Sequence, residues 1–291
     1  MSTWPRHLHA GDAVQLAAAS SALAADALER LQEGVAVLEG WGLRVRPHPQ
    51  PLRRWGYLAG DDRERKRDLQ PDAPLLACLR GGWGAARLLE QAEPLTGGDA
   101  HWLLGFSDVT SLLWAREAAG IRGGIHGPML TTLAGEPEWS QERLRRLLFG
   151  ETLPPLSGDG WCKGVAEGPL LVGNLTVATH LLGTPHLPDL SGAVLILEDV
   201  GEAPYRLDRM ITHWRLCGAL QQLAGIGFGS FSGCDDPDSA FRLEEVLRER
   251  TADLGVPVLG ALPVGHDPGN AALPLGRPAR LDADGGTLSL L

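Results

Sequence analysis

The chain is organised around the segment His101-Trp-Leu-Leu-Gly105-Phe-Ser107-Asp-Val-Thr-Ser-Leu-Leu-Trp114. A short apolar run ends at Gly105, and apolar residues then recur at the spacing of a helix. The pattern predicts a buried strand that turns sharply into a helix, with Ser107 at the corner. Such a corner lifts a serine hydroxyl out of the sheet, beside the free N–H groups at the start of the helix, as in a nucleophile elbow. An ordinary N-cap has the same pattern, because a capping serine also stands just before a helix.

On either side of this stretch, apolar runs alternate with helical periodicities. Residues 75–79 form a continuous apolar run, which is typical of a parallel strand buried on both faces. The highly charged segment 61–69 is expected to be a solvated helical face. Alternating strands and helices predict an α/β fold, with a doubly wound parallel sheet in an N-terminal domain of residues 1–150. Further expected elements are strands at 13–19 and 43–45 and a helix at 23–38.

The composition changes after residue 150. Residues 151–163 are rich in Pro, Gly, Ser and Asp and show no periodicity, so they are expected to be a linker. Residues 164–291 are expected to form a second, β-rich α/β domain. Its clearest elements are a strand at 193–197 and a helix at about 205–223.

Composition and charge restrict the class of protein. The chain has 291 residues, enough for two domains, and a net charge of -10, which argues against nucleic acid or an anionic membrane as the main partner. Its four cysteines form no Cys-x-x-Cys pair and suggest neither a zinc cage nor a disulfide framework. The small apolar run 13–25 is interrupted by polar residues, so we expect a strand and a turn rather than a signal segment. No stretch reaches the ~20 apolar residues of a membrane span. A cytoplasmic protein is expected.

A serine needs a base to become a nucleophile at neutral pH, and that base is usually a histidine held by a carboxylate. Nine histidines are present. His126 lies at an expected strand end, where it could face the site, and a loop hydrogen bond explains it equally well. His266 stands in a loop rich in Gly, Pro and Asn, a setting that fixes a catalytic side chain.

Acidic residues follow the apolar run 194–197. Glu198 comes directly after it, and an acid at the end of a buried strand must be paired, hydrogen-bonded or protonated. Orienting a histidine meets that need, and so does a structural salt bridge. Asp199 and Glu202 compete with Glu198 for the role.

Arg80-Gly81-Gly82 follows the buried run 75–79. Backbone N–H groups of such a turn can point into a cleft and stabilise an oxyanion, whereas the sequence lacks the spacing of a phosphate-binding loop. Arg80 can pair a substrate carboxylate or bridge to a neighbouring acid.

Six motifs in fixed order span nearly the whole chain and together resemble the LD-carboxypeptidase family of serine peptidases, the muramoyltetrapeptide carboxypeptidases. They are Arg80-Gly-Gly-Trp-Gly-Ala-Ala-Arg87-Leu-Leu, Gly105-Phe-Ser107-Asp108-Val-Thr110, His126-Gly-Pro128, Gly173-Asn174-Leu, Leu197-Glu198-Asp199-Val-Gly-Glu202-x-x-Tyr205-Arg206 and Gly265-His266-x-x-x-Asn270.

The resemblance implies a Ser–Glu–His triad of Ser107, Glu198 and His266 at an interface between the two domains. It implies oxyanion donors at the backbone N–H groups of Asp108 and Gly82. The expected reaction removes the terminal D-alanine from a murein tetrapeptide during peptidoglycan recycling, in a cytoplasmic homodimer, without metal or cofactor and with no nucleic-acid or membrane partner.

Three residues are expected to contact the peptide: Arg80, Trp83 and Asn174. Trp83 stands where Tyr is common in the family, and Val172 replaces the first Gly of a usual Gly-Gly-Asn. The first change is expected to affect specificity and the second the packing near Asn174.

Two other functions fit the same resemblance. A branch similar to microcin-immunity proteins cleaves peptidyl or aminoacyl adenylates, and a non-catalytic relative would bind a ligand without turnover. The sequence leaves open whether lysine or diaminopimelate precedes the D-alanine.

Overall fold

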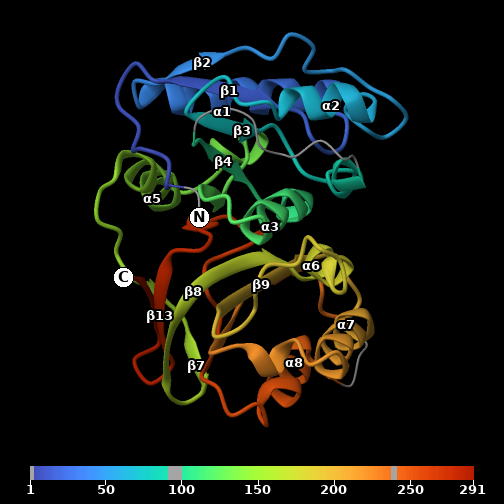
Figure 1. Ribbon diagram of the computed structural model, residues 1–291, viewed down its shortest axis with the longest axis vertical. Coiled ribbons are helices and arrows are strands. Elements are labelled where there is room, and N and C mark those ends of the chain that lie inside the picture. Colours follow the sequence, from blue (N-terminus) through green and yellow to red (C-terminus); the bar gives the residue numbers. More distant parts are fainter. Residues whose placement is uncertain (1–2, 91–99, 237–240) are drawn as a thin grey trace. The chain divides into compact units, whose positions relative to one another are not determined.

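The computed structural model describes residues 3–90, 100–236 and 241–291 (Figure 1). The chain divides into two compact units, each built around its own sheet. Unit 1 comprises Met1–Thr152 and Ala271–Pro274, and unit 2 comprises Leu153–Asn270 and Leu275–Leu291. Both units mix helices with strands, so the predicted α/β class is confirmed.

The sheet of unit 1 has the order β12-β5-β4-β3-β1-β2. Every pair is parallel except β12–β5. The chain winds in one direction from β1 to β2 and in the other from β3 to β5, so the sheet is doubly wound, as predicted. In such sheets, ligands bind beyond the carboxyl ends of the strands, where the winding reverses. The strands are β1 (Ala13–Ala17), β2 (Arg44–Arg46), β3 (Leu75–Cys78), β4 (Trp102–Gly105), β5 (Gly124–His126) and β12 (Leu273–Pro274).

Helices connect these strands and cover the sheet. Their apolar residues recur on one face; in α1, for example, Leu31, Gly34 and Leu38 are buried. Strands β3 and β4 are buried at every position, which explains their uninterrupted apolar sequence. The helices are α1 (Leu28–Gly40), α2 (Asp62–Asp68), α3 (Thr110–Ala118), α4 (Leu130–Leu133) and α5 (Glu138–Phe149), with short 3-10 turns at Ala25–Ala27, Ala86–Glu90 and Ser107–Val109.

The interpretation of 61–69 as a solvated face is wrong for part of α2. Arg65 and Lys66 are 0% and 3% exposed. Arg65 is buried because its guanidinium donates to two backbone carbonyls and to Asp62. A buried charge with such partners cannot be recognised from a charged sequence alone.

The sheet of unit 2 has the order β6-β14-β13-β8-β9-β10-β11-β7. Its central strands, β8 to β11, are parallel, and the remaining pairs are antiparallel. This mixed sheet agrees with the expected β-rich α/β domain. Its strands are β6 (Leu156–Ser157), β7 (Asp159–Cys162), β8 (Val165–Asn174), β9 (Val194–Val200), β10 (Gly225–Ser232), β11 (Val258–Gly260), β13 (Pro278–Asp282) and β14 (Thr287–Leu290).

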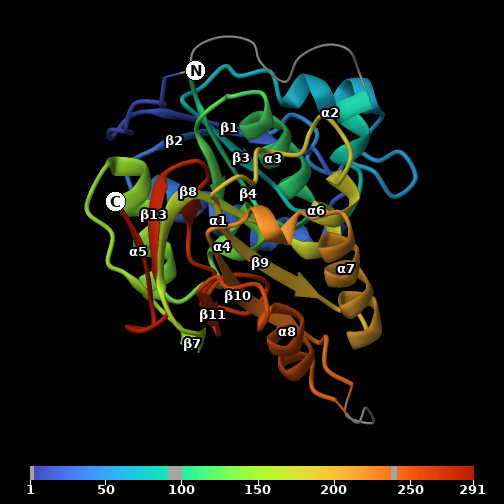
Figure 2. The same ribbon diagram turned by 60° about the horizontal axis from the view of Figure 1, so that its bottom comes forward.

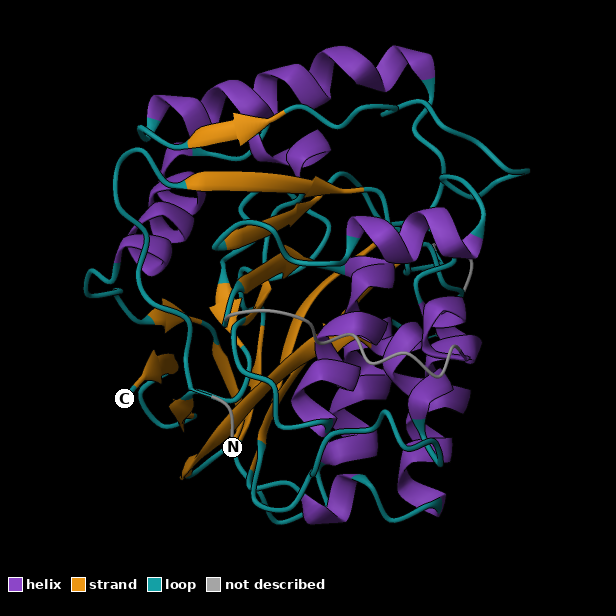
Figure 3. Cartoon of the chain, turned by 45° about the horizontal axis from the view of Figure 1, so that its top comes forward, coloured by secondary structure: helices purple, strands orange, loops and turns teal. Residues whose placement is uncertain are grey.

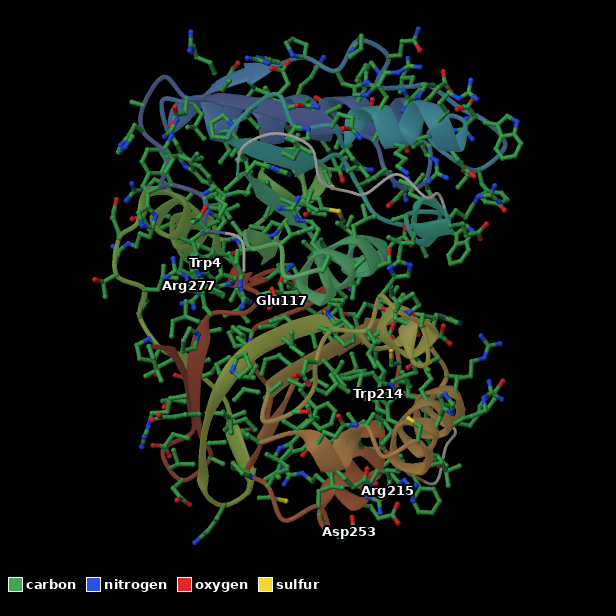
Figure 4. The ribbon with its side chains drawn as sticks, viewed as in Figure 1. Trp4, Glu117, Trp214, Arg215, Asp253 and Arg277 are labelled. Carbon is green, nitrogen blue, oxygen red and sulfur yellow. The ribbon has the colours of Figure 1, made fainter. Side chains whose placement is uncertain are left out.

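Three helices of unit 2 lie on one side of its sheet: α6 (Leu175–Leu181), α7 (Pro204–Leu216) and α8 (Leu243–Thr251) (Figures 2 and 3). The strands β8 to β11 succeed one another in a single direction, so right-handed crossovers place all three connecting helices on the same face. Arg215 of α7 forms a double contact with Asp253, at 2.7 Å for each N–O pair, and Figure 4 shows the two side chains facing one another. Among the described residues, no helix is long and apolar enough to cross a membrane.

The segment expected to be a linker, 151–163, contains strands. Strand β6 pairs with β14 and β7 pairs with β11, both within unit 2. These are short edge strands with Gly and Ser in them, so their sequence lacks a strand's apolar alternation. The chain also returns to unit 1 at 271–274, where β12 pairs with β5. A two-residue strand leaves no periodicity by which the sequence could show this return.

Candidate active site

Ser107 lies at the corner between β4 and the helices that follow. Its φ is 59°, in the left-handed region that non-glycine residues rarely adopt. Phe106 occupies the N-cap position of the 3-10 turn Ser107–Val109, so the N-cap alternative does not describe Ser107. A strained serine between a buried strand and a helix is the arrangement of a nucleophile elbow.

The turn after β3 lies against this serine. A Cβ atom added to Gly81 would stand 3.0 Å from Ser107 Cβ and 3.1 Å from Ser107 Oγ, so a larger residue here would crowd the serine. The next residues are held by Ser21, whose Oγ accepts a hydrogen bond from Trp83 N at 2.9 Å. The Gly81-Gly82 turn and Ser107 therefore form one local cluster within unit 1.

Arg80 and Trp83 flank the turn. Arg80 is half-buried, and it donates to Ala22 O at 3.3 Å and to Gly81 O at 3.2 Å. Across the described ranges, the salt bridges do not include Arg80. Trp83 is 47% exposed, which leaves its ring open to a ligand.

In unit 2, Glu198 and His266 form a close pair. Glu198 lies in β9, is fully buried, and its Oε2 is 2.7 Å from His266 Nδ1. Burial raises the pKa of Glu198, although the hydrogen bond and charge of His266 oppose this. Burial of the His266 ring favours its neutral form, but the hydrogen bond and charge of Glu198, with Asp199 and Asp267, outweigh it and raise the pKa of His266. The Glu198 carboxyl group therefore makes the imidazole of His266 more basic than burial alone would leave it.

The contacts of unit 2 distinguish Glu198 from the two competing acids. Asp199 accepts hydrogen bonds from Asn174 Nδ2 at 3.0 Å and from the N–H and hydroxyl of Thr176 at 2.8 Å each. Glu202 lies near Arg206, at 3.4 Å. Of these three acids, Glu198 is the one whose carboxylate contacts His266.

Asn174 is 4% exposed and caps helix α6. Its Oδ1 accepts from Val177 N at 3.1 Å, and its Nδ2 donates to Asp199. Both ends of the Asn174 amide thus form hydrogen bonds inside unit 2. A substrate contact was predicted for Asn174 from the sequence, and this helix-capping role was not. The sequence Asn-Leu-Thr at the end of an apolar strand is itself an N-cap signal.

The loop that carries His266 is fixed from several sides. Gly265 has a φ of 132°, and its N–H donates to Asn270 Oδ1 at 3.0 Å. Ser232 of β10 donates to Asp267 Oδ1 at 2.7 Å. Sequence reasoning did not assign Ser232 to the site, because nothing in the sequence connects the end of β10 with this loop.

His126 lies in β5 and is fully buried, with its ring in an edge contact with Phe106 at 5.7 Å between centroids. His126 is thus the last residue of β5, at the strand end where the sequence predicted it. Within residues 3–90, 100–236 and 241–291, no group of three or more His, Cys, Asp or Glu side chains is arranged to hold a metal ion.

Sequence families match both halves of the chain. The N-terminal domain of the LD-carboxypeptidases matches residues 14–127, and their C-terminal domain matches residues 167–281. A Synechocystis protein named as a carboxypeptidase is 47% identical over 294 residues, which cover 99% of this chain and 97% of the relative. The murein tetrapeptide carboxypeptidase of Pseudomonas aeruginosa is 36% identical, with 93% of each chain covered.

Among solved structures, the microcin C7 self immunity protein in complex with aspartyl sulfamoyl adenosine has the same fold. Its TM-score is 0.89 at 23% identity, with 99% of this chain and 98% of that one covered. The structural likeness shows the fold alone, whereas the two family matches and the 47% identical relative show the family. The chain therefore belongs to the LD-carboxypeptidase family, and it is an enzyme, a serine-type carboxypeptidase.

Proposed function

We propose that this enzyme hydrolyses the L,D peptide bond to the terminal D-alanine of murein tetrapeptides, with Ser107, His266 and Glu198 as its triad. The observation that carries the proposal is the 2.7 Å contact between His266 Nδ1 and a fully buried carboxylate. The 36% identical relative from Pseudomonas aeruginosa, named for this reaction, supports the substrate.

The contact with Glu198 selects the tautomer of His266. The carboxylate accepts a hydrogen bond from Nδ1–H, so the lone pair of the neutral ring is on Nε2. In the proposed first step, Nε2 takes the proton of the Ser107 hydroxyl while Oγ attacks the scissile carbonyl. The imidazolium that results is stabilised by Glu198.

The tetrahedral intermediate carries a negative oxygen, which the backbone N–H groups of Gly82 and Asp108 stabilise in the proposal. The 3.1 Å approach between a Cβ at residue 81 and Ser107 Oγ supports a turn at the right place for this. His266 then gives its proton to the leaving D-alanine, and the acyl-enzyme forms. Water repeats both steps and releases the tripeptide.

An exopeptidase must also recognise the free carboxylate at the end of its substrate. In the proposal, Arg80 binds it, and Trp83 flanks the peptide. A guanidinium suits a carboxylate because it offers two parallel N–H donors.

A second candidate is the hydrolysis of peptidyl or aminoacyl adenylates. The likeness to the microcin C7 self immunity protein with aspartyl sulfamoyl adenosine favours it as the alternative. It uses the same acyl-transfer chemistry, so the triad residues do not separate the two.

Purified enzyme is assayed with murein tetrapeptide and, separately, with an aminoacyl sulfamoyl adenosine. Release of D-alanine from the tetrapeptide supports the first candidate, cleavage of the adenylate mimic supports the second, and binding of either without turnover would contradict both. Ser107→Ala is expected to abolish release, whereas Ser191→Ala, in an exposed turn of unit 2, leaves it unchanged. Full activity of Ser107→Ala would contradict the proposal.

A further inference from the structure

Two buried charges of opposite sign hold one peptide group of the turn after β3. Arg65 of α2 is fully buried, and its Nη1 donates to Gly84 O at 2.7 Å and to Ala19 O at 2.6 Å. Asp108 is 1% exposed, and its Oδ2 accepts from Ala85 N at 2.9 Å. The peptide between Gly84 and Ala85 therefore has a guanidinium on its carbonyl and a carboxyl oxygen on its N–H.

Both charges are costly to bury. Removing an ion from water costs several kcal/mol, so such groups persist where hydrogen bonds and opposite charges offset the cost. Burial raises the pKa of Asp108, while the Ser20 hydroxyl, the N–H groups of Ala85 and Gly84 and the charge of Arg65 act in the opposite direction. The partners of this carboxylate are thus mainly groups of the turn itself.

The turn needs such external support. Three of residues 81–84 are glycines, which have little conformational preference of their own. An oxyanion donor, in contrast, must lie about 2.7–3.1 Å from the developing charge, and a displacement of about 1 Å lowers the rate strongly. Ser21 holds Trp83 N, and the Arg65 and Asp108 contacts hold the peptide that follows.

Asp108 has a special place in this arrangement because it directly follows Ser107. In the proposed function, its backbone N–H is one oxyanion donor, and its side chain fixes the turn that supplies the other, Gly82 N–H. We propose that Arg65 and Asp108 are positioning residues that set the spacing of the two oxyanion donors around Ser107. We call the contacts of Arg65 and Asp108 with the Gly84–Ala85 peptide the clamp. The clamp itself rests on hydrogen bonds within unit 1, whereas the role of the two oxyanion donors rests on the proposed function.

The test measures how fast a fluorophosphonate probe labels Ser107, identified by peptide mass spectrometry. Phosphonylation of a serine uses the same oxyanion donors as acyl transfer, but it does not depend on which peptide or adenylate is the natural substrate. The variants are Asp108→Asn, Asp108→Ala, Arg65→Lys and Arg65→Met. Each rate is compared with the kcat and KM for murein tetrapeptide.

Loss of one oxyanion donor lowers rates by about 100- to 1,000-fold in related chemistry. Asp108→Ala and Arg65→Met are therefore expected to slow labelling about 100-fold and to lower kcat more than they raise KM. Asp108→Asn and Arg65→Lys each retain one hydrogen bond to the turn and are expected to recover about tenfold of that loss.

The matched control is Arg116→Met. Arg116 is also a buried arginine of unit 1, 3% exposed and bonded to His101 and to backbone carbonyls, but it contacts no part of the turn. Its loss is expected to lower the urea midpoint while folded protein is labelled at the wild-type rate.

Labelling of folded Asp108→Ala and Arg65→Met as fast as folded Arg116→Met would overturn the clamp. Asp108→Asn and Arg65→Lys give the same comparison if the larger substitutions do not fold. Wild-type protein that is labelled at Ser107 but does not release D-alanine would reject the tetrapeptide substrate and leave the clamp supported by the rates. Wild-type protein that is not labelled at Ser107 would reject the serine mechanism and the clamp with it.

Discussion

Replacing Glu198 by glutamine changes the charge next to His266 while retaining the shape of the side chain. Asn174 Nδ2 donates to Asp199 Oδ1, and the same amide acts as a donor toward Glu198, where it lowers the pKa of that carboxyl group. A glutamine that keeps its oxygen toward this donor turns its own NH2 toward His266 Nδ1. Nδ1 must then accept, and the ring proton moves to Nε2, the atom that should take the serine proton.

The size of the fall in kcat depends on which end of the glutamine amide faces His266. If the glutamine oxygen faces His266, the charged hydrogen bond becomes a neutral one, a loss of about 1–1.5 kcal/mol or roughly tenfold in rate. If the NH2 faces it, the wrong tautomer is fixed, which lowers kcat about 10⁴-fold in a serine protease. The donor role of Asn174 favours the second outcome. We expect kcat to fall by about 10³ to 10⁴, or roughly 4–5.5 kcal/mol.

The pH dependence gives an independent check. The base must be neutral, and Glu198 raises the pKa of His266 against the opposing effect of burial. In the wild type, the rising limb of kcat/KM is therefore expected above pH 6.5, the ordinary value for histidine. Without the carboxylate charge, the pKa of His266 falls, so the limb of Glu198→Gln moves to lower pH.

The assay is D-alanine release from murein tetrapeptide between pH 5 and 9. Glu202→Gln is the matched control, because Glu202 is an acid of the same segment that lies near Arg206 and not near His266. It should stay within about twofold of the wild type. A Glu198→Gln rate within threefold of the wild type, with an unmoved limb, would refute the role of this pair.

Three further predictions concern other parts of the site. Gly265→Ala places a Cβ against Ser230 Oγ and 3.0 Å from Glu198 Oε2, so kcat should fall about 100-fold, whereas Gly164→Ala, with a similar φ of 124° against 132° and no atom nearer than 3.6 Å, should keep its rate; equal kcat values would contradict the crowding at Ser230 and Glu198. Ser107→Gly should be more stable than Ser107→Ala by about 0.5–1 kcal/mol in urea unfolding, because glycine adopts the φ of 59° without strain; an alanine variant of equal stability would show that the elbow is not strained. Arg80→Met should lower kcat/KM for the tetrapeptide by about 1.5–3 kcal/mol, or roughly 10- to 150-fold, but leave any residual turnover of the C-terminally amidated peptide unchanged; an equal loss with both peptides would exclude a contact to the carboxylate.

The parallel strands could be predicted from the sequence because burial on both faces demands continuous apolar residues. The run 75–79 became β3, and 194–197 lies within β9. The corner at Ser107 was also predictable, since Gly105 interrupts a strand immediately before a helical pattern. Glu198 could be predicted as a site residue for a related reason, because an acid at the end of a buried apolar run needs a partner.

Other features depend on contacts between distant segments and could not be predicted. The buried Arg65 looks in sequence like any residue of a charged helix, because its carbonyl partners come from the segment after β1 and the turn after β3. The edge strands β6 and β7 are polar and short, so their pairing is determined by the neighbouring strands rather than by their own sequence. The engagement of Asn174 by Asp199 likewise requires the register of β8 against β9.

In the proposed mechanism, Ser107 becomes acylated by the substrate and His266 is its base. The most direct measurement is rapid quenching of the enzyme during turnover of murein tetrapeptide, followed by mass spectrometry of the peptide that contains Ser107. The account predicts a tripeptidyl ester on Ser107 in the wild type and its loss, by about 10³-fold or more in rate of formation, in His266→Ala. An ester on another residue, or one that forms on Ser107 equally fast in His266→Ala, would contradict it.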